Sequence, residues 1–182
     1  MICIKKITDN DFNNPIISIK NPRRRYSARG LVFNDKGEIA ILYKKKKNEY
    51  KLIGGGMLND EKPYETFKRE ALEETGCEIN INKCLGTIEE VKSHDNFIQI
   101  SYVYVSHVIK NNKKLYLTQQ EIAEKSICLW LNIEDAIKCI HDCEDKLIAS
   151  NYDGEMSIYH TKFIVRRDYE ILKYYIDNKK SL

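Results

Sequence analysis

Residues 54–77 restrict the fold more than any other part of the sequence, because they join a run of glycines to a glutamate-rich segment of helical character. Glu70, Glu73 and Glu74 are spaced i, i+3 and i+4, so a helix places their carboxylates on one face. Like charges at this spacing destabilise a helix by about 0.2–0.5 kcal/mol per pair, and a counter-ion must offset that cost. Mg²⁺ prefers carboxylate oxygens and is commonly shared with substrate phosphates. The segment therefore indicates metal-dependent phosphate chemistry.

The ends and the opposite face of this helix can also be read from the sequence. Pro63 suits its first position, and Gly76 suits a left-handed C-terminal cap. The glycines at 54–56 let the backbone approach a ligand or metal closely. The face opposite the glutamates carries apolar side chains at helical spacing: Tyr64, Phe67, Ala71 and Leu72. We expect this face to pack on the core and the glutamates to face a cleft.

The same segment resembles the signature of the Nudix hydrolase family, G-x5-E-x7-R-E-U-x-E-E-x-G-U, where U is a bulky apolar residue. Every strictly typed position matches, namely Gly55, Glu61, Arg69, Glu70, Glu73, Glu74 and Gly76. Ala71 and Cys77 are smaller than the usual residues, and Ile53 and Lys62 stand where many members have proline and threonine. The resemblance implies an α/β/α sandwich with a mixed β-sheet. It also implies hydrolysis of a diphosphate linkage in a nucleoside diphosphate joined to a further group X.

The resemblance implies a role for each residue of the signature. Glu73 and Glu74 would hold Mg²⁺, for which Mn²⁺ is a possible substitute, and Glu70 would be a metal ligand or the general base. Arg69 would orient the carboxylates, and Glu61 would stabilise the loop, with metal ligation as its alternative role. The backbone carbonyl of Gly54 would be a further ligand, and the backbone at Gly55 and Gly56 would approach the substrate.

Outside this segment the sequence offers fewer candidates. By resemblance, Glu124, six residues before Trp130, is a candidate metal ligand, and Glu121 is the nearby alternative. Both could equally be ordinary surface residues. Arg29 is a candidate for substrate binding, because a guanidinium group matches phosphate in a bidentate geometry. The spacing of Cys139, His141 and Cys143 does not support a zinc site, because a helix there turns the histidine away from the cysteines.

The substrate is less well determined than the chemistry. Residues 91–95 contain neither the proline typical of ADP-ribose hydrolases of the family nor the tyrosine typical of dinucleoside-polyphosphate hydrolases. This favours a nucleoside triphosphate, oxidised or not, as the substrate of a pyrophosphohydrolase. ADP-ribose and nucleotide sugars are the first alternatives. An RNA-decapping hydrolase and a non-catalytic Nudix module that binds nucleotides are further ones.

Composition limits the remaining possibilities. The chain has 182 residues, a formal charge of +3 and six cysteines without disulfide-framework spacing, as expected for a cytoplasmic protein with reduced thiols. No apolar run approaches the length of a membrane span, so we expect no membrane association. The expected partner is a small nucleotide; a nucleic-acid partner is not expected, and a homodimer is left open.

Patterns of apolar and turn residues predict the arrangement of elements. We expect an N-terminal extension at 1–25, a Nudix hydrolase domain at 26–145, and a C-terminal helical extension at 146–182 packed on the same domain. Expected strands cover 26–33, 38–44, 50–53, 78–91, 97–109 and 126–131. One helix should begin after Asn132, and a last helix should cover 157–177. The expected packing stripe of the last helix is Phe163, Ile164, Ile171, Leu172, Tyr175 and Ile176.

Overall fold

The computed structural model describes residues 1–148, 151–152 and 155–180 of the chain. In this part the strands form one mixed sheet of seven, in the order β1-β5-β6-β2-β4-β3-β7. The strands are β1 (Cys3–Thr8), β2 (Arg23–Phe33), β3 (Ile39–Lys44), β4 (Glu49–Gly56), β5 (Cys77–Lys92), β6 (Phe97–Asn111) and β7 (Ser126–Leu131). The α-helices are α1 (Pro63–Thr75), α2 (Gln119–Ala123), α3 (Ile133–Asp145) and α4 (Glu155–Asn178). Short 3-10 helices cover Asp9–Phe12 and Ser93–Asp95.

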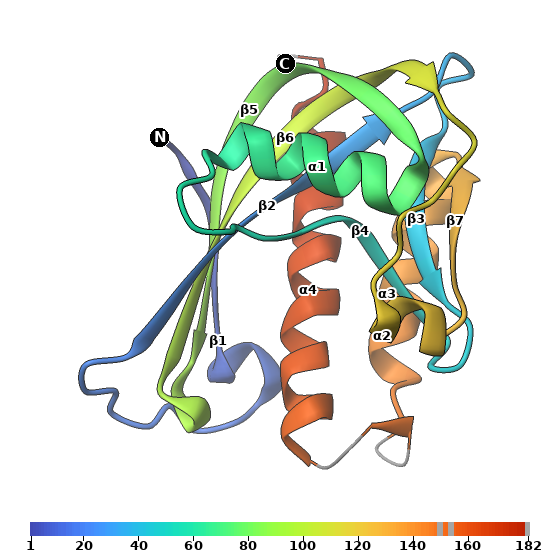
Figure 1. Ribbon diagram of the computed structural model, residues 1–182. Coiled ribbons are helices and arrows are strands. Elements are labelled where there is room, and N and C mark those ends of the chain that lie inside the picture. The colour runs from blue at the N-terminus through green and yellow to red at the C-terminus, as the bar shows by residue number, and fades with distance from the viewer. Residues whose placement is uncertain (149–150, 153–154, 181–182) are drawn as a thin grey trace.

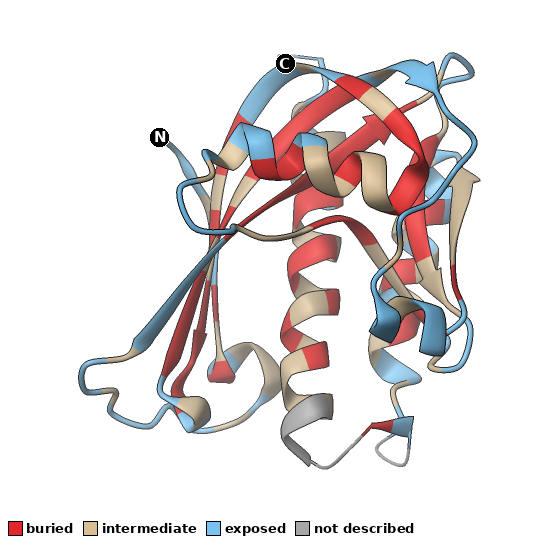
Figure 2. Ribbon diagram, viewed as in Figure 1, coloured by how far each residue is buried: buried red, intermediate tan, exposed pale blue. Residues whose placement is uncertain are grey.

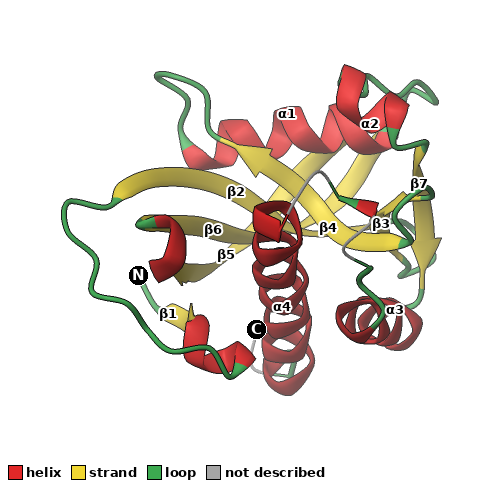
Figure 3. Ribbon diagram, turned by 90° about the horizontal axis from the view of Figure 1, so that it is seen from below, coloured by secondary structure: helices red, strands yellow, loops and turns green. Residues whose placement is uncertain are grey.

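Helices cover both faces of the sheet. In Figures 1 and 3, α1 lies on one face, and α3 and α4 lie on the other. One cluster of buried side chains joins the sheet to α1 through Phe67 and Ala71. A second and larger cluster joins the opposite face to α3 and α4 through Ile140 and Phe163. The predicted α/β/α sandwich with a mixed sheet is confirmed.

Strand β2 contributes side chains to the hydrophobic clusters on both faces of the sheet, because successive side chains of a strand point to opposite faces. Ala28 and Val32 belong to the cluster under α1, whereas Leu31 and Phe33 belong to the cluster under α4. Figure 2 shows buried residues along the middle of the sheet and on α1 and α4. Arg29, on the α4 side of this strand, is therefore placed in the interior rather than at the surface.

Several boundaries differ from those expected. Strand β2 starts at Arg23 rather than residue 26, because it pairs in parallel with β6 from Arg23 onward. Part of the expected extension at 1–25 is a strand of the sheet, since β1 pairs in parallel with β5. The helix at α2 was not expected. The signature helix, in contrast, begins at Pro63 and is capped by Gly76 at a φ of 71°, as predicted.

Helix α4 buries more than an apolar stripe. Phe163, Ile171 and Leu172 are buried as expected, but so are Arg167 and Asp168. Asp168 accepts a hydrogen bond from the backbone N–H of Leu52 in β4 at 2.9 Å. The last helix is thus attached to β4 two residues before Gly54. No helix in the described part of the chain combines the length and the apolarity that a membrane crossing requires.

Candidate active site

Strand β4 ends in glycines that lie directly against α1. Glu74 accepts a hydrogen bond from the backbone N–H of Gly54 at 2.8 Å. A Cβ atom on Gly55 would lie 2.3 Å from Oε1 of Glu70, so only glycine leaves that carboxylate where it is. Gly54 has a φ of +138°, and a Cβ there would come within 2.4 Å of the Ala28 carbonyl oxygen. The glycines thus let the strand approach two of the helix carboxylates.

Arg69 connects the carboxylates of the signature. Its Nε donates to Glu61 at 2.7 Å, and its Nη1 donates to Glu70 at 2.8 Å and to Glu73 at 3.1 Å. Its Nη2 donates to Glu61 and to the carbonyl oxygen of Gly56, both at 3.1 Å. One planar guanidinium group therefore fixes the loop, the strand end and the helix face relative to one another.

Glu61 is held as an anchor of the loop. It accepts a hydrogen bond from the Thr66 hydroxyl at 2.7 Å and from the Leu58 N–H at 3.0 Å, besides those from Arg69. Hydrogen bonding to Arg69 lowers the pKa of Glu61 to about 2, with further lowering by Leu58 and Thr66 outweighing the opposing effect of burial. The carboxylate therefore stays ionised throughout the neutral range.

Two carboxylates of α1, those of Glu74 and Glu73, have raised pKa values, in contrast to Glu61. Burial raises the pKa of Glu74 to about 7, even though the Lys51 ammonium lies 2.7 Å from Oε1; the charge of Glu70 raises it further. Burial also raises the pKa of Glu73, and Glu70 adds to the rise while Arg69 opposes it. Negative charge is thus concentrated on this face beyond what Arg69 and Lys51 neutralise.

The donor chemistry of this face suits a hard divalent cation. All its side-chain donors are carboxylate oxygens, which Mg²⁺ and Mn²⁺ prefer. At present Arg69 holds Glu70 and Glu73, and Lys51 holds Glu74. Within the described ranges, no three acidic, histidine or cysteine side chains are gathered in a ligand arrangement. A metal would therefore bind by taking over oxygens that now face Lys51 and Arg69.

The two glutamates near Trp130 differ in position. Glu124 faces the β3–β4 hairpin, where Lys47 lies at 2.9 Å and Lys44 at 3.2 Å, so the structure does not bring it to the helix carboxylates. Glu121 lies 3.9 Å from the Lys51 ammonium, which also binds Glu74. The spacing to Trp130 could not separate the two, because the turn of α2 decides which of them faces the hairpin.

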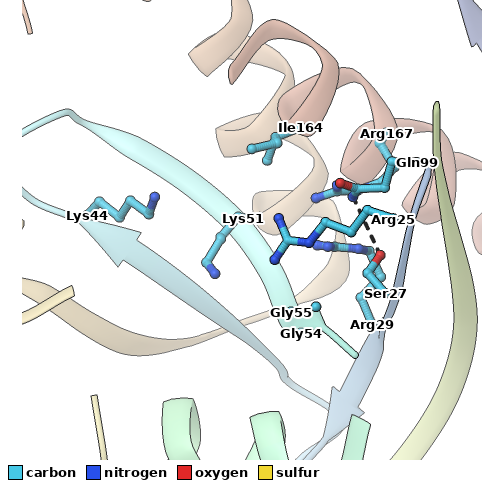
Figure 4. Close-up of a pocket in the computed structure, with 11 residues that line it drawn as sticks. Arg25, Ser27, Arg29, Lys44, Lys51, Gly54, Gly55, Gln99, Ile164 and Arg167 are labelled. Carbon is cyan, nitrogen blue, oxygen red and sulfur yellow. Dashed lines mark hydrogen bonds between the residues drawn. The ribbon is translucent and has the colours of Figure 1, made fainter. Parts of the chain in front are cut away.

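A cavity of about 150 Å³ lies between the glycine end of β4, strand β2 and helix α4. Figure 4 shows that cationic side chains from four elements surround it. They are Arg25 and Arg29 of β2, Lys44 of β3, Lys51 of β4 and Arg167 of α4. Gly54, Gly55 and Gly56 line its wall, so it adjoins the helix carboxylates. The sequence pointed to Arg29 and the glycines as substrate-binding residues, but did not reveal Lys51 or Arg167.

Comparison with known proteins decides the family. The model of the NUDIX domain family matches residues 23–150, which is more than half of the chain. The chain belongs to the Nudix family. It is a Nudix hydrolase, and members of this family act on small nucleotide substrates and generally use divalent metal ions. No curated protein matches the chain.

Solved structures share the Nudix fold at low identity. The Nudix hydrolase from Nitrosomonas europaea is 12% identical with a TM-score of 0.51, over 69% of this chain and 91% of that one. The E. coli ORF135 protein is 14% identical with a TM-score of 0.51, over 92% and 97%. The MutT protein from Methanosarcina mazei Go1 is 19% identical with a TM-score of 0.48, over 81% and 96%. The first two structures, with TM-scores of 0.51, are similar to this chain in fold alone.

Proposed function

We propose that this Nudix hydrolase cleaves a diphosphate linkage in a nucleoside diphosphate joined to a further group, in a reaction that depends on Mg²⁺. A nucleoside triphosphate, oxidised or not, is the substrate that we place first. The observation that carries the proposal is the position of the carboxylates of α1, which lie beside a glycine strand that lines a cationic cavity. A diphosphate can lie along the glycines with its charge facing the cations.

The metal site that we propose consists of Glu73 and Glu74 with the carbonyl oxygen of Gly54, and Glu70 beside them is either a further ligand or the general base. Bound Mg²⁺ would neutralise charge on the diphosphate and lower the pKa of a water molecule. The structure favours Glu121 over Glu124 as an additional carboxylate, since Glu121 shares Lys51 with Glu74. Glu124 is already engaged by Lys44 and Lys47.

The residues of the chain divide the remaining work. Glu70 is our candidate for the general base, because its carboxylate faces Gly55 at the wall of the cavity and Arg69 fixes its position. Arg69 also keeps Glu73 oriented, and Glu61 anchors the loop that holds both. When Glu74 binds the metal instead of Lys51, the Lys51 ammonium can donate a hydrogen bond to a phosphate oxygen from the cavity wall.

The charge of the cavity supports a substrate with several phosphates. Its cationic side chains match a triphosphate better than a singly charged group. The described residues that line it include no aromatic side chain, so the recognition of a base would come from elsewhere. The cavity therefore supports recognition of the phosphates, and the base is to be identified by the substrate panel.

The test is product release from a panel of compounds, measured with Mg²⁺, with Mn²⁺ and with EDTA. The panel holds ordinary and oxidised deoxynucleoside triphosphates, ADP-ribose, a nucleotide sugar, a dinucleoside polyphosphate and capped RNA. We expect metal-dependent turnover with a preference for a triphosphate. Preference for ADP-ribose or a nucleotide sugar would overturn the substrate assignment. Nucleotide binding without turnover at any metal concentration would overturn the reaction itself.

A further inference from the structure

A chain of buried ion pairs links β5, α4 and β2 behind the cavity. Lys92 lies 2.9 Å from Glu90, and Glu90 lies 3.0 Å from Arg167. Arg167 lies 2.8 Å from Asp168, and Asp168 lies 3.7 Å from Arg29. None of these side chains is more than 5% exposed. Charges this deep contribute favourably only when they are paired and hydrogen-bonded.

This series of ion pairs has an excess of positive charge, and Arg29 stands at its end. It contains three cations and only two carboxylates, Glu90 and Asp168. Asp168 already accepts hydrogen bonds from the Leu52 N–H at 2.9 Å and from Arg167 at 2.8 Å. Its contact with Arg29, at 3.7 Å, is the longest of these ion pairs. Arg29 is therefore the cation with the weakest pairing.

Arg29 is also incompletely hydrogen-bonded. Its Nε is buried and has no hydrogen-bond partner in the described part of the chain. Burial lowers the pKa of this guanidinium to about 10, and the like charge of Arg167 lowers it further, against the opposing effect of Asp168. Both arginines line the same cavity (Figure 4). An anion in that cavity would satisfy the free donor and balance the excess charge together.

We propose that Arg29 of β2 and Arg167 of α4 form one anion subsite in this cavity, which binds a phosphate group of the substrate. The proposal rests on the proposed function, because the cavity adjoins the carboxylates through the glycines of β4. Phosphate suits the pair because guanidinium groups bind it through paired, charge-assisted hydrogen bonds. Since Arg167 lies beyond residues 23–150, α4 would add a binding residue from outside the segment that the family model covers.

The test measures binding of inorganic pyrophosphate without metal, by calorimetry in EDTA, for wild type, Arg29→Met and Arg167→Lys. Arg166→Met is the matched control, because Arg166 neighbours Arg167 in sequence but pairs with Glu144 and does not line the cavity. We expect both test variants to bind pyrophosphate about tenfold or more weakly, and the control to bind like wild type. Adenosine, which carries no phosphate, should bind all four proteins equally.

A thermal melt without ligand separates binding from structural support. Arg29→Met removes a poorly paired buried charge and keeps apolar volume, so its Tm should equal or exceed that of wild type. Arg167→Lys keeps a cation for Glu90 and Asp168, which guards against loss of the fold. Unchanged pyrophosphate affinity in both variants, or no binding by wild type, would overturn the subsite. Metal-dependent turnover of nucleotides by wild type, measured in parallel, would then show that the proposed function stands without it.

Discussion

At the scale of single residues, Arg69 shows why the signature needs an arginine. It reaches three carboxylates and one carbonyl, all within 3.1 Å. A lysine ammonium is a compact point charge and cannot donate in several fixed directions within one plane. Without the guanidinium, the carboxylates of Glu61, Glu70 and Glu73 would face one another unbridged.

We therefore expect Arg69→Lys to lower the free energy of unfolding by about 1–3 kcal/mol, since several hydrogen bonds to charged groups are lost. Turnover should fall about tenfold or more, because Glu70 and Glu73 lose their orientation. Urea denaturation and metal-dependent turnover measure the two effects. Lys68→Met, which changes an exposed neighbour on the same helix, is the control. Wild-type values for Arg69→Lys in both assays would show that the bridge is dispensable.

The sequence predicts how the glutamates of α1 lie relative to one another, but only the folded structure shows which glutamate near Trp130 approaches them. The spacing of the glutamates on α1 is local, so the sequence alone predicted that they share a face. Whether Glu121 or Glu124 approaches them depends on α2, a short helix whose orientation is set by contacts distant in sequence. The same holds for Lys51, because its partner Glu74 lies 23 positions away in the sequence and the two meet only in the folded chain.

At the scale of elements, the site depends on how closely β4 approaches α1. The contact is made at Gly55, whose missing side chain leaves room for the Glu70 carboxylate. The obstacle to a methyl group here is the end of a flexible side chain, not backbone. The carboxylate can therefore move aside while the strand and the helix keep their places.

We expect Gly55→Ala to fold while its turnover falls about tenfold or more, because a displaced Glu70 is out of position for catalysis. Gly37→Ala is the opposite case. Gly37 has a φ of +76° in an open turn, so alanine should cost about 1 kcal/mol of stability without affecting turnover. Thermal melts and turnover of both variants test the contrast. Normal activity in Gly55→Ala would mean that Glu70 does not need its observed position.

The elements themselves were predicted unevenly, for physical reasons. Strands β3, β5, β6 and β7 follow local apolar patterns and turn signals, and they lie where expected to within a few residues. Strand β1 was missed because its pairing with β5 joins residues about 80 positions apart. The apolar stripe of α4 was visible, but the burial of Arg167 and Asp168 was not. Two adjacent charges on a helix are buried only when distant partners such as Glu90 exist.

At the scale of the whole molecule, Glu90 joins the interior strand β5 to the last helix. It binds Lys92 at 2.9 Å and Arg167 at 3.0 Å, and Arg29 lies further along the same chain of charges. Burial by itself raises the pKa of Glu90, but Lys92 and Arg167 outweigh it, and Arg29 contributes as well, so that the pKa is lowered to about 2. The fold therefore gains stability from ionised Glu90.

This arrangement predicts a dependence of stability on pH. Because the pKa of Glu90 is lower in the folded than in the unfolded chain, its contribution is complete above an ordinary value of 4.5 and is lost as the pH falls toward about 2. At neutral pH, Glu90→Gln should lower the free energy of unfolding by about 3–5 kcal/mol, because buried Lys92 loses its carboxylate partner and Arg167 keeps only Asp168. Urea denaturation of both proteins at several pH values should show the difference narrowing below pH 4.5. A difference that stays constant down to pH 2 would contradict the assignment.

We propose that the carboxylates of α1 support metal-dependent hydrolysis. The most direct measurement compares Mg²⁺-dependent release of product from a nucleoside triphosphate by wild type, Glu73→Gln and Glu74→Gln, with folding checked by circular dichroism. We predict turnover by wild type that EDTA abolishes, and folded variants that are about 100-fold or more slower, since each lost ligand removes several kcal/mol of transition-state stabilisation. Turnover close to that of wild type in both variants would contradict the claim.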